Sequence, residues 1–238
     1  MGTLSGKNIV KKYGKDTVLK NVNVEIETGK IYGLIGRNGA GKTTLLSILT
    51  AQNPATEGTV TLDGQPVWEN EEALSHICYS REISQVTMFG PNTLKVKDYL
   101  STAKSFYRNW DEDYARELVE AFNINPKKRV SKLSKGMLSA VTIIIALASK
   151  ADITILDEPV AGLDVVAREQ FYKLVIEEYA NTGRTFIIST HIIEEAASLF
   201  EKVIIIDDGE TSTRTNTIFI IFTRITFKKN ALNFVSYF

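Results

Sequence analysis

A glycine-rich run near the start of the chain constrains the fold more than any other feature. It reads Gly36-Arg37-Asn38-Gly39-Ala40-Gly41-Lys42-Thr43-Thr44, which is the spacing of a loop that cradles phosphate groups. Glycines let consecutive backbone N–H groups turn toward an anion, and the following helix adds the positive end of its dipole. We therefore expect this phosphate loop to bind a nucleoside triphosphate, with Lys42 on the β- and γ-phosphates and the Thr43 hydroxyl on Mg²⁺. The expected nucleotide contacts are Gly36, Asn38, Gly39, Ala40, Gly41, Lys42, Thr43 and Thr44.

The segments on either side of the phosphate loop support this interpretation over a glycine-rich turn before an ordinary helix. Residues 30–35 are mostly apolar and predict a short buried strand, and residues 43–51 predict a helix. The loop therefore lies at a strand-to-helix turn, which is where phosphate binding requires it.

The composition argues against nucleic-acid binding, internal disulfides and a membrane-spanning segment. Lys and Arg total 28 and Asp and Glu total 28, so the net charge provides no general attraction to nucleic acid, and no nucleic-acid partner is expected. The single cysteine, Cys78, cannot form an internal disulfide, and the start of the chain lacks the apolar core of a secretion signal. No apolar run approaches the roughly 20 residues that cross a bilayer. We expect a cytosolic protein whose role at a membrane would need a partner chain.

The order of predicted elements indicates an α/β domain with a mostly parallel sheet. Helical spacing covers residues 93–123, where Val96, Tyr99, Leu100, Ala103 and Phe106 begin the pattern. A helical subdomain of about residues 90–150 therefore divides the core. Strands are predicted at 22–26, 30–35, 59–62, 153–156, 185–189 and 203–206, and a further helix at 166–179.

Two adjacent carboxylates follow one of the predicted strands. The apolar run 153–156 ends in Asp157-Glu158, and open α/β sheets bind ligands at the carboxyl ends of their strands. Asp157 is expected to support Mg²⁺, directly or through water. Glu158 is placed to orient and deprotonate the water that attacks the γ-phosphate. An ordinary acidic turn is the alternative, and the phosphate loop upstream argues against it.

A further motif, Leu133-Ser134-Lys135-Gly136-Met137, precedes a long apolar segment. With the motifs above, it makes the chain resemble the ATP-binding subunit of an ABC transporter, whose signature is usually Leu-Ser-Gly-Gly-Gln. The Ser-Lys-Gly-Met form resembles a bacterial branch associated with efflux or resistance to antimicrobial peptides. Ser134 is suited to cap a helix whose free N–H groups face phosphate.

The resemblance implies a single ABC ATPase domain over residues 1–238, with a P-loop NTPase core, an antiparallel β subdomain and an inserted helical subdomain. It implies that Tyr13 stacks on adenine, that Asp164 belongs to a loop coupling two copies, and that His191 contacts the γ-phosphate. Two subunits would face head to tail, so that Ser134 and Gly136 of one cover the nucleotide in the other. The catalytic residues would be Glu158, His191 and Lys42.

The resemblance also implies the partners: ATP, Mg²⁺, a second ABC ATPase subunit in a homo- or heterodimer, and a transmembrane permease that holds the chain at the inner face of the membrane. The transported substrate stays open, and export is favoured over import. Two alternatives are a soluble ATP-dependent switch and a poorly hydrolysing regulatory module. Relatives in translation usually carry two cassettes, and those in DNA maintenance insert long coiled coils, neither of which this chain contains.

Three segments depart from the family pattern. Where the family has a glutamine that contacts Mg²⁺, the context Ile77-Cys78-Tyr79-Ser80-Arg81 places Glu82, and Gln85 competes for the role. Glu82 is favoured on its motif context. A carboxylate can still ligate Mg²⁺, although it adds negative charge beside the triphosphate. Residues 138–141 are unusually apolar, either to meet a hydrophobic partner or to extend the core. Residues 211–238 form an atypical tail that is not expected to be needed for nucleotide chemistry, and within it 217–222 resemble an edge strand.

Overall fold

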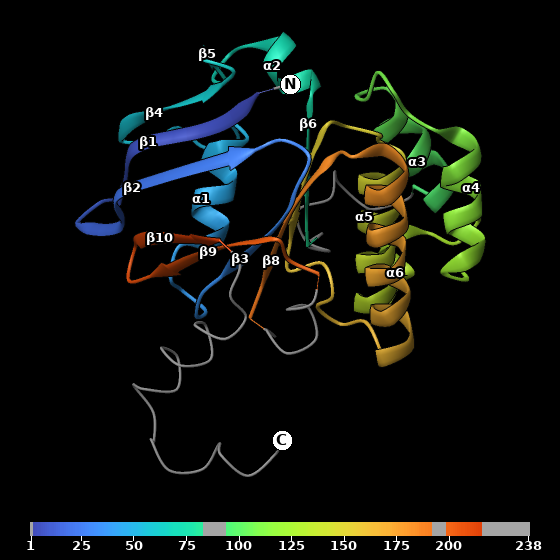
Figure 1. Cartoon of the computed structure of the whole chain (residues 1–238). Helices are drawn as coiled ribbons and strands as arrows, with labels where there is room; N and C mark the ends of the chain where they lie inside the picture. Colours follow the sequence, from blue (N-terminus) through green and yellow to red (C-terminus); the bar gives the residue numbers. More distant parts are fainter. Residues whose placement is uncertain (1, 83–93, 192–198, 216–238) are drawn as a thin grey trace, which may run out of the picture.

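The computed structural model describes residues 2–82, 94–191 and 199–215, and a six-stranded sheet forms its centre (Figure 1). The strand order is β10-β9-β3-β8-β7-β6; neighbours from β9 to β6 are parallel and β10 is antiparallel to β9. In the register, Asp157 lies beside Arg81 on one side and Ser189 on the other. The carboxyl ends of the parallel strands therefore share one edge. The strands are β3 (Ile31–Ile35), β6 (Ile77–Arg81), β7 (Ile153–Asp157), β8 (Thr185–Thr190), β9 (Lys202–Asp207) and β10 (Glu210–Thr215).

A smaller antiparallel sheet, of order β2-β1-β4-β5, covers one face of the large sheet, with α1 (Lys42–Leu49) between them (Figure 1). Leu4 and Ile9 of the small sheet, Leu45 of α1 and Ile187 of the large sheet belong to one buried apolar cluster. This packing fixes the start of α1 against the end of β3. The strands are β1 (Thr3–Tyr13), β2 (Asp16–Glu27), β4 (Glu57–Leu62) and β5 (Gln65–Pro66).

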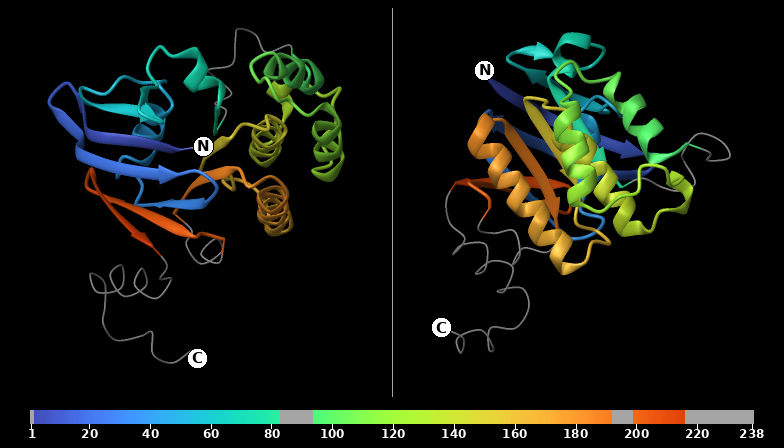
Figure 2. Two further views of the ribbon diagram at one scale, coloured as in Figure 1. Left: turned by 45° about the horizontal axis from the view of Figure 1, so that its top comes forward. Right: turned by 90° about the vertical axis from the view of Figure 1, so that its right-hand side faces the viewer.

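Helices cover the opposite face of the large sheet (Figures 1 and 2). Their shared core contains Val96, Leu118, Ile143 and Phe171. None of the helices in the described ranges is long and apolar enough to span a bilayer. The helices on this face are α3 (Val96–Lys104), α4 (Glu112–Ala121), the 3-10 turn η1 (Val130–Lys132), α5 (Lys135–Ala148) and α6 (Val165–Thr182). The short α2 (Glu71–Ser75) lies beside the small sheet and packs in its apolar cluster through Ala73 (Figure 1).

The apolar residues 138–141 lie in the N-terminal half of α5, and their burial shows whether they face a partner or extend the core. Residues 138–141 are all buried, as is most of the helix after them. The polar member of the run, Ser139, donates a hydrogen bond from Oγ to the Ala161 carbonyl oxygen at 2.6 Å. The run therefore extends the core rather than presenting an apolar face to a partner.

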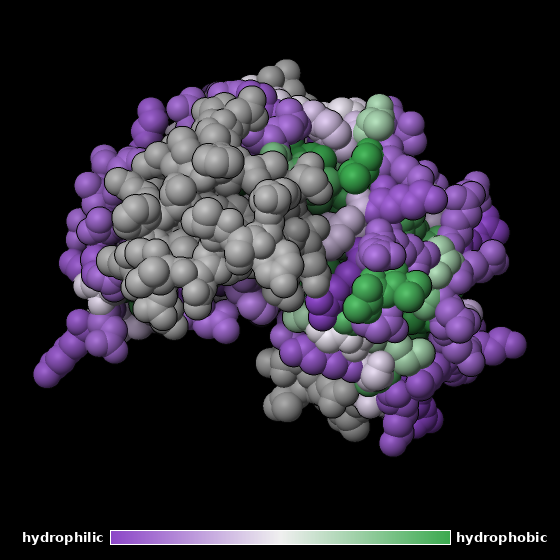
Figure 3. All heavy atoms as spheres, turned by 60° about the horizontal axis from the view of Figure 1, so that its bottom comes forward, coloured by the Kyte–Doolittle hydropathy of each residue, from purple (hydrophilic) through white to green (hydrophobic). Residues whose placement is uncertain are grey.

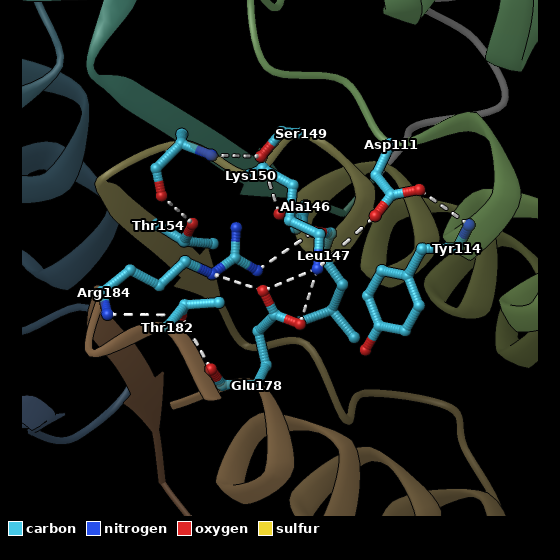
Figure 4. A network of polar contacts seen from close by, with 11 residues as sticks. Asp111, Tyr114, Ala146, Leu147, Ser149, Lys150, Thr154, Glu178, Thr182 and Arg184 are labelled. Carbon is cyan, nitrogen blue, oxygen red and sulfur yellow. Dashed lines mark hydrogen bonds and ion pairs between the residues drawn. The ribbon is translucent and has the colours of Figure 1, made fainter. Parts of the chain in front are cut away.

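A group of mostly buried charges joins the helices to the sheet near the amino ends of β7 and β8 (Figure 4). Lys150 Nζ donates to both carboxylate oxygens of Glu178, each at 2.9 Å. Arg184 Nε lies 3.4 Å from Glu178 Oε1, and Arg184 Nη2 donates to the Leu147 carbonyl oxygen at 3.1 Å. Lys150 Nζ also lies 4.0 Å from the centre of the Tyr114 ring. We call Lys150, Glu178 and Arg184 the buried charge cluster; it ties α4, α5, α6 and the start of β8 together.

The predicted α/β fold, mostly parallel sheet, antiparallel subdomain and helical subdomain are confirmed, with local differences. The sequence prediction missed β1, β5, β6, β10 and α2, and it began β2 six residues late. Phe106 lies beyond the end of α3 and is 76% exposed, so it is not on the buried helix face. Residues 211–215 belong to β10, paired with β9, so the predicted tail begins inside the sheet. The suggested edge strand at 217–222 lies outside the described residues.

Candidate nucleotide site

The phosphate loop joins the end of β3 to the start of α1, and its shape requires glycine. At Gly36, an added Cβ atom would lie 2.5 Å from the Ile206 carbonyl oxygen, so only glycine fits there. Gly39 and Gly41 have φ values of 83° and 106°, which side chains disfavour. Gly41 precedes α1 without a side-chain cap, so N–H groups of the first turn remain to bind an anion. Asn38, Ala40, Thr43 and Thr44 lie on the same loop and first turn, with Thr43 exposed.

Lys42 is almost fully buried and is held by the loop that precedes it. Its Nζ donates to the carbonyl oxygens of Gly36 at 2.8 Å and Arg37 at 3.3 Å. The same nitrogen lies 3.3 Å from Glu158 Oε1. The lysine charge is thus positioned between the phosphate loop and the end of β7.

Asp157 ends β7 and is buried, and each of its carboxylate oxygens accepts one hydrogen bond from a neighbouring strand. Ser189 Oγ donates to Oδ1 at 2.6 Å, and the Tyr79 hydroxyl donates to Oδ2 at 3.3 Å. Burial and the nearby Asp157 charge raise the pKa of Tyr79, so this hydroxyl stays protonated as a donor. A carboxylate has about four acceptor positions, so Asp157 retains capacity to hold Mg²⁺ or its water. The oxygen donors of Asp157 and Thr43 are of the kind Mg²⁺ prefers.

Glu158 contacts both of the other predicted catalytic residues. Its Oε2 lies 2.7 Å from His191 Nδ1, and its Oε1 faces Lys42 without forming a hydrogen bond. The Glu158 backbone has φ of 50°, and its N–H donates to Ser189 Oγ at 2.8 Å. The predicted catalytic residues therefore meet at Glu158: Lys42 is the first residue of α1, and Glu158 and His191 directly follow β7 and β8. We call these three the catalytic group.

Ser189 is a site residue that the sequence prediction missed. Its hydroxyl accepts from the Glu158 N–H and donates to Asp157, so it fixes both carboxylate residues at once. The sequence could have pointed to Ser189 through its position, because it is the last residue of the predicted strand 185–189. In a parallel sheet that strand end lies beside the end of the strand carrying Asp157.

The predicted signature residues lie on a separate helix start. Ser134 caps α5 by accepting the Met137 N–H at 3.3 Å, and Asp164 caps α6 by accepting the Ala167 N–H at 2.8 Å. Gly136 packs on the loop after β7, because a Cβ atom there would lie 2.5 Å from the Gly162 carbonyl oxygen. Ser134 and Asp164 thus bond to their own helices rather than to the catalytic group.

The two remaining predicted residues have partners of their own. Tyr13 ends β1 with its ring half exposed, and its hydroxyl accepts from Asn53 Nδ2 at 2.5 Å. Glu82 follows β6, and its Oε1 lies 3.1 Å from Lys135 Nζ. Gln85 lies outside the described residues, so its competition with Glu82 stays open.

Comparison with known proteins identifies the family. The family model described as ABC transporter matches residues 19–161. The lantibiotic transport ATP-binding protein SrtF of Streptococcus pyogenes is 31% identical over 208 residues, which cover 86% of each chain. The linearmycin resistance ATP-binding protein LnrL of Bacillus subtilis (strain 168) is 30% identical, over 87% of this chain and 67% of that protein. These matches extend well beyond the phosphate loop.

Solved structures agree with the sequence comparison. The ATP-binding subunit of an ABC transporter is 24% identical with a TM-score of 0.80 over 95% of each chain, which supports the fold. A dimeric bacterial ABC transporter cassette is 25% identical with a TM-score of 0.76, over 89% of this chain and 98% of that one. The chain therefore belongs to the ABC transporter family, as an ATP-binding subunit with ABC-type ATPase activity.

Proposed function

We propose that this chain works as a head-to-tail dimer with a second ABC ATPase subunit and drives a separate transmembrane permease from the cytoplasmic side of the membrane. The observation that carries the proposal is the separation of two half-sites within one chain. Lys42 and His191 both contact Glu158, whereas Ser134 caps α5 and Gly136 packs on the loop after β7. A dimeric relative of known structure supports joining the two halves across subunits.

Hydrolysis in this arrangement depends on positioning and charge. Bound Mg²⁺, held by Asp157 and Thr43, would neutralise phosphate charge. Lys42 stabilises the charge that develops on the phosphates, and Glu158 accepts the proton of the attacking water. His191 holds the Glu158 carboxylate through its Nδ1 contact. The presence of this contact favours a hydrolysing subunit over the poorly hydrolysing regulatory module.

The names of relatives favour export as the direction of transport. They include lantibiotic transport in Streptococcus pyogenes, bacitracin transport in Enterococcus faecalis and linearmycin resistance in Bacillus subtilis. We propose that this chain serves an exporter of an antimicrobial compound of that kind. Recognition of the compound belongs to the permease.

The half-site arrangement can be tested by mixing two inactive variants. The Lys42→Ala variant loses the lysine that would bind the phosphates of ATP. The Ser134→Arg variant carries a bulky side chain at the start of α5 that would keep this helix from contacting the nucleotide of the other subunit. A mixed dimer then retains one composite site made of the unaltered loop of one chain and the unaltered helix of the other. Single-turnover ATP hydrolysis should therefore reappear on mixing.

The control is the double variant Lys42→Ala with Ser134→Arg, mixed with either single variant. Every site in that mixture contains at least one altered half, so no hydrolysis should appear. If mixing the two single variants also restores nothing, although each alone is folded and Ser134→Arg still binds ATP, the composite site is wrong. Co-purification of a membrane protein with the tagged chain tests the permease partner separately.

A further inference from the structure

Two residues that depart from the family pattern contact each other. Glu82 is the favoured candidate for the position where the family has glutamine, and Lys135 stands where its signature has glycine. In the structure, Lys135 Nζ and Glu82 Oε1 are 3.1 Å apart. The pair connects the segment leaving β6 with the first residue of α5.

The stem of Lys135 is held on a third segment. An added Cβ atom on Gly162 would lie 2.8 Å from Lys135 Cγ and 3.1 Å from its Cδ, so the lysine stem rests on the Gly162 backbone. Gly162 lies in the loop after β7, which follows Asp157 and Glu158. Lys135 therefore links the signature helix, the loop after β7 and the segment that carries Glu82.

The positive charge at the start of α5 explains why Lys135 needs an anion beside it. A helix N-terminus carries partial positive charge, so a lysine there is unfavourable on its own and an anion beside it is favourable. Glu82 supplies that anion within the chain. A phosphate group bound at the same helix start would supply it too, and the two anions repel each other.

We propose that Glu82 is the counter-ion of Lys135 in the free subunit, and that the triphosphate carried by a second copy displaces it when the dimer closes. The proposal rests on the composite site described under the proposed function. Glu82 is then a positioning residue, whose release from α5 reports that nucleotide has bound between the subunits. The side chains are 53% and 59% exposed, so the contact is weak enough to exchange.

The test measures the ATP concentration that gives half-maximal dimer, by sedimentation velocity. All chains carry Glu158→Gln, which slows hydrolysis so that ATP-bound dimers accumulate. Glu82→Gln removes the competing anion, so it should lower the required ATP concentration about two- to fivefold, the range of an exposed ion pair. In a chain that also carries Lys135→Met, the same replacement should change it by less than about 1.5-fold.

Lys132→Met provides a matched control, since Lys132 is an exposed lysine three residues earlier. Glu82→Gln should keep its full effect in that background. An equal effect of Glu82→Gln with and without Lys135 overturns the proposal. So does a rise in the required ATP concentration, which would instead indicate that Glu82 ligates Mg²⁺.

ATP binding to the monomer and thermal unfolding distinguish a failure of the proposed function from a failure of this inference. If ATP binds the monomer but no variant forms an ATP-dependent dimer, the proposed function itself fails. If dimers form without coupling between Glu82 and Lys135, only this inference fails. Thermal unfolding of each free subunit confirms that the variants are folded before their dimerisation is compared.

Discussion

Two lysine–glutamate pairs lie at opposite ends of β7 and β8 and are built from similar residue types. At the carboxyl ends, Lys42 faces Glu158, which also contacts His191. At the amino ends, Lys150 binds Glu178, which also lies beside Arg184. The sheet therefore places a carboxylate between two nitrogen-bearing side chains at both ends.

The two groups differ in how fully the carboxylate is satisfied. Both oxygens of Glu178 accept hydrogen bonds from Lys150, and its side chain is 4% exposed. Glu158 is 22% exposed and its Oε1 accepts no hydrogen bond within the described residues. In the buried charge cluster the charges hold the helices and the sheet together. In the catalytic group, Oε1 of Glu158 is left able to accept a hydrogen bond from a ligand. Replacing residues in each should therefore have opposite consequences.

The largest expected effect is on turnover at the catalytic group. Glu158→Gln keeps the shape of the side chain but removes the base, so ATP turnover should fall by about 10²- to 10⁴-fold. Binding of ATP should be retained, because Lys42 and the phosphate loop are unchanged. Steady-state phosphate release and ATP titration measure the two properties. Near-normal turnover would show that another group accepts the proton.

The buried charge cluster should respond in stability instead. Glu178→Gln leaves the buried Arg184 charge without its carboxylate, whereas Lys150 is 23% exposed and still has Asp111 Oδ2 at 3.9 Å. The unpaired Arg184 should cost about 3–5 kcal/mol in the free energy of unfolding. Urea unfolding measures this cost. The matched control is Glu177→Gln on the same helix, whose exposed side chain pairs with exposed Lys173. A loss in the control as large as in Glu178→Gln would show that the effect is a general one of charge on α6.

Ser189 is buried and also holds Asp157 and Glu158 in place, so its replacement should lower both the free energy of unfolding and ATP turnover, each by an intermediate amount. Ser189→Ala removes the acceptor for the Glu158 N–H and the donor to Asp157. Leaving those groups unpaired should cost about 1–3 kcal/mol in the free energy of unfolding. Turnover should fall more than ATP affinity, because both carboxylate residues lose their fixed position. Equal losses in turnover and affinity would argue that Ser189 acts only on the fold.

The smallest effect is expected at a partly exposed pair, His76 with Asp152, whose atoms Nδ1 and Oδ2 are 2.5 Å apart. The hydrogen bond with Asp152 raises the pKa of His76 above its ordinary value of 6.5, against the effect of burial. The folded protein therefore binds this proton more tightly than the unfolded chain. The resulting stabilisation is complete below about pH 6.5 and is lost as pH rises through the raised pKa.

Urea unfolding at a series of pH values from 6 upward should show a small decline in stability that His76→Gln removes. The charge at His76 is partly solvated, since the side chain is about one-third exposed. An unchanged decline in His76→Gln would assign it to another group. The His76–Asp152 pair would then contribute nothing measurable to stability.

Prediction from sequence succeeded where residues that act together are close in the chain. The phosphate loop and Asp157-Glu158 each form one short pattern at a strand end, and their strands were predicted with them. It failed for β1, because polar residues and register shifts between Gly6 and Lys12 interrupt the alternation that marks a strand. Asn8 in this strand even has φ of 51°.

Long-range partners were not predictable in the same way. Ser189 lies more than thirty residues from the carboxylates that it binds, and Glu178 pairs with a lysine on another element. No local periodicity encodes such contacts; they arise when the parallel register brings separate strand ends together. The Glu82–Lys135 contact is of the same kind, since the two departures were visible in the sequence but their meeting was not.

The left-handed backbone of Glu158 has a consequence for engineering. A residue with a side chain at positive φ costs on the order of 1–3 kcal/mol when the surrounding structure must hold it there, and glycine or asparagine adopts that conformation more easily. Variants selected only for resistance to heat should therefore accumulate Glu158→Gly or Glu158→Asn and lose turnover. Directed evolution of this subunit needs activity as a second criterion at that single position.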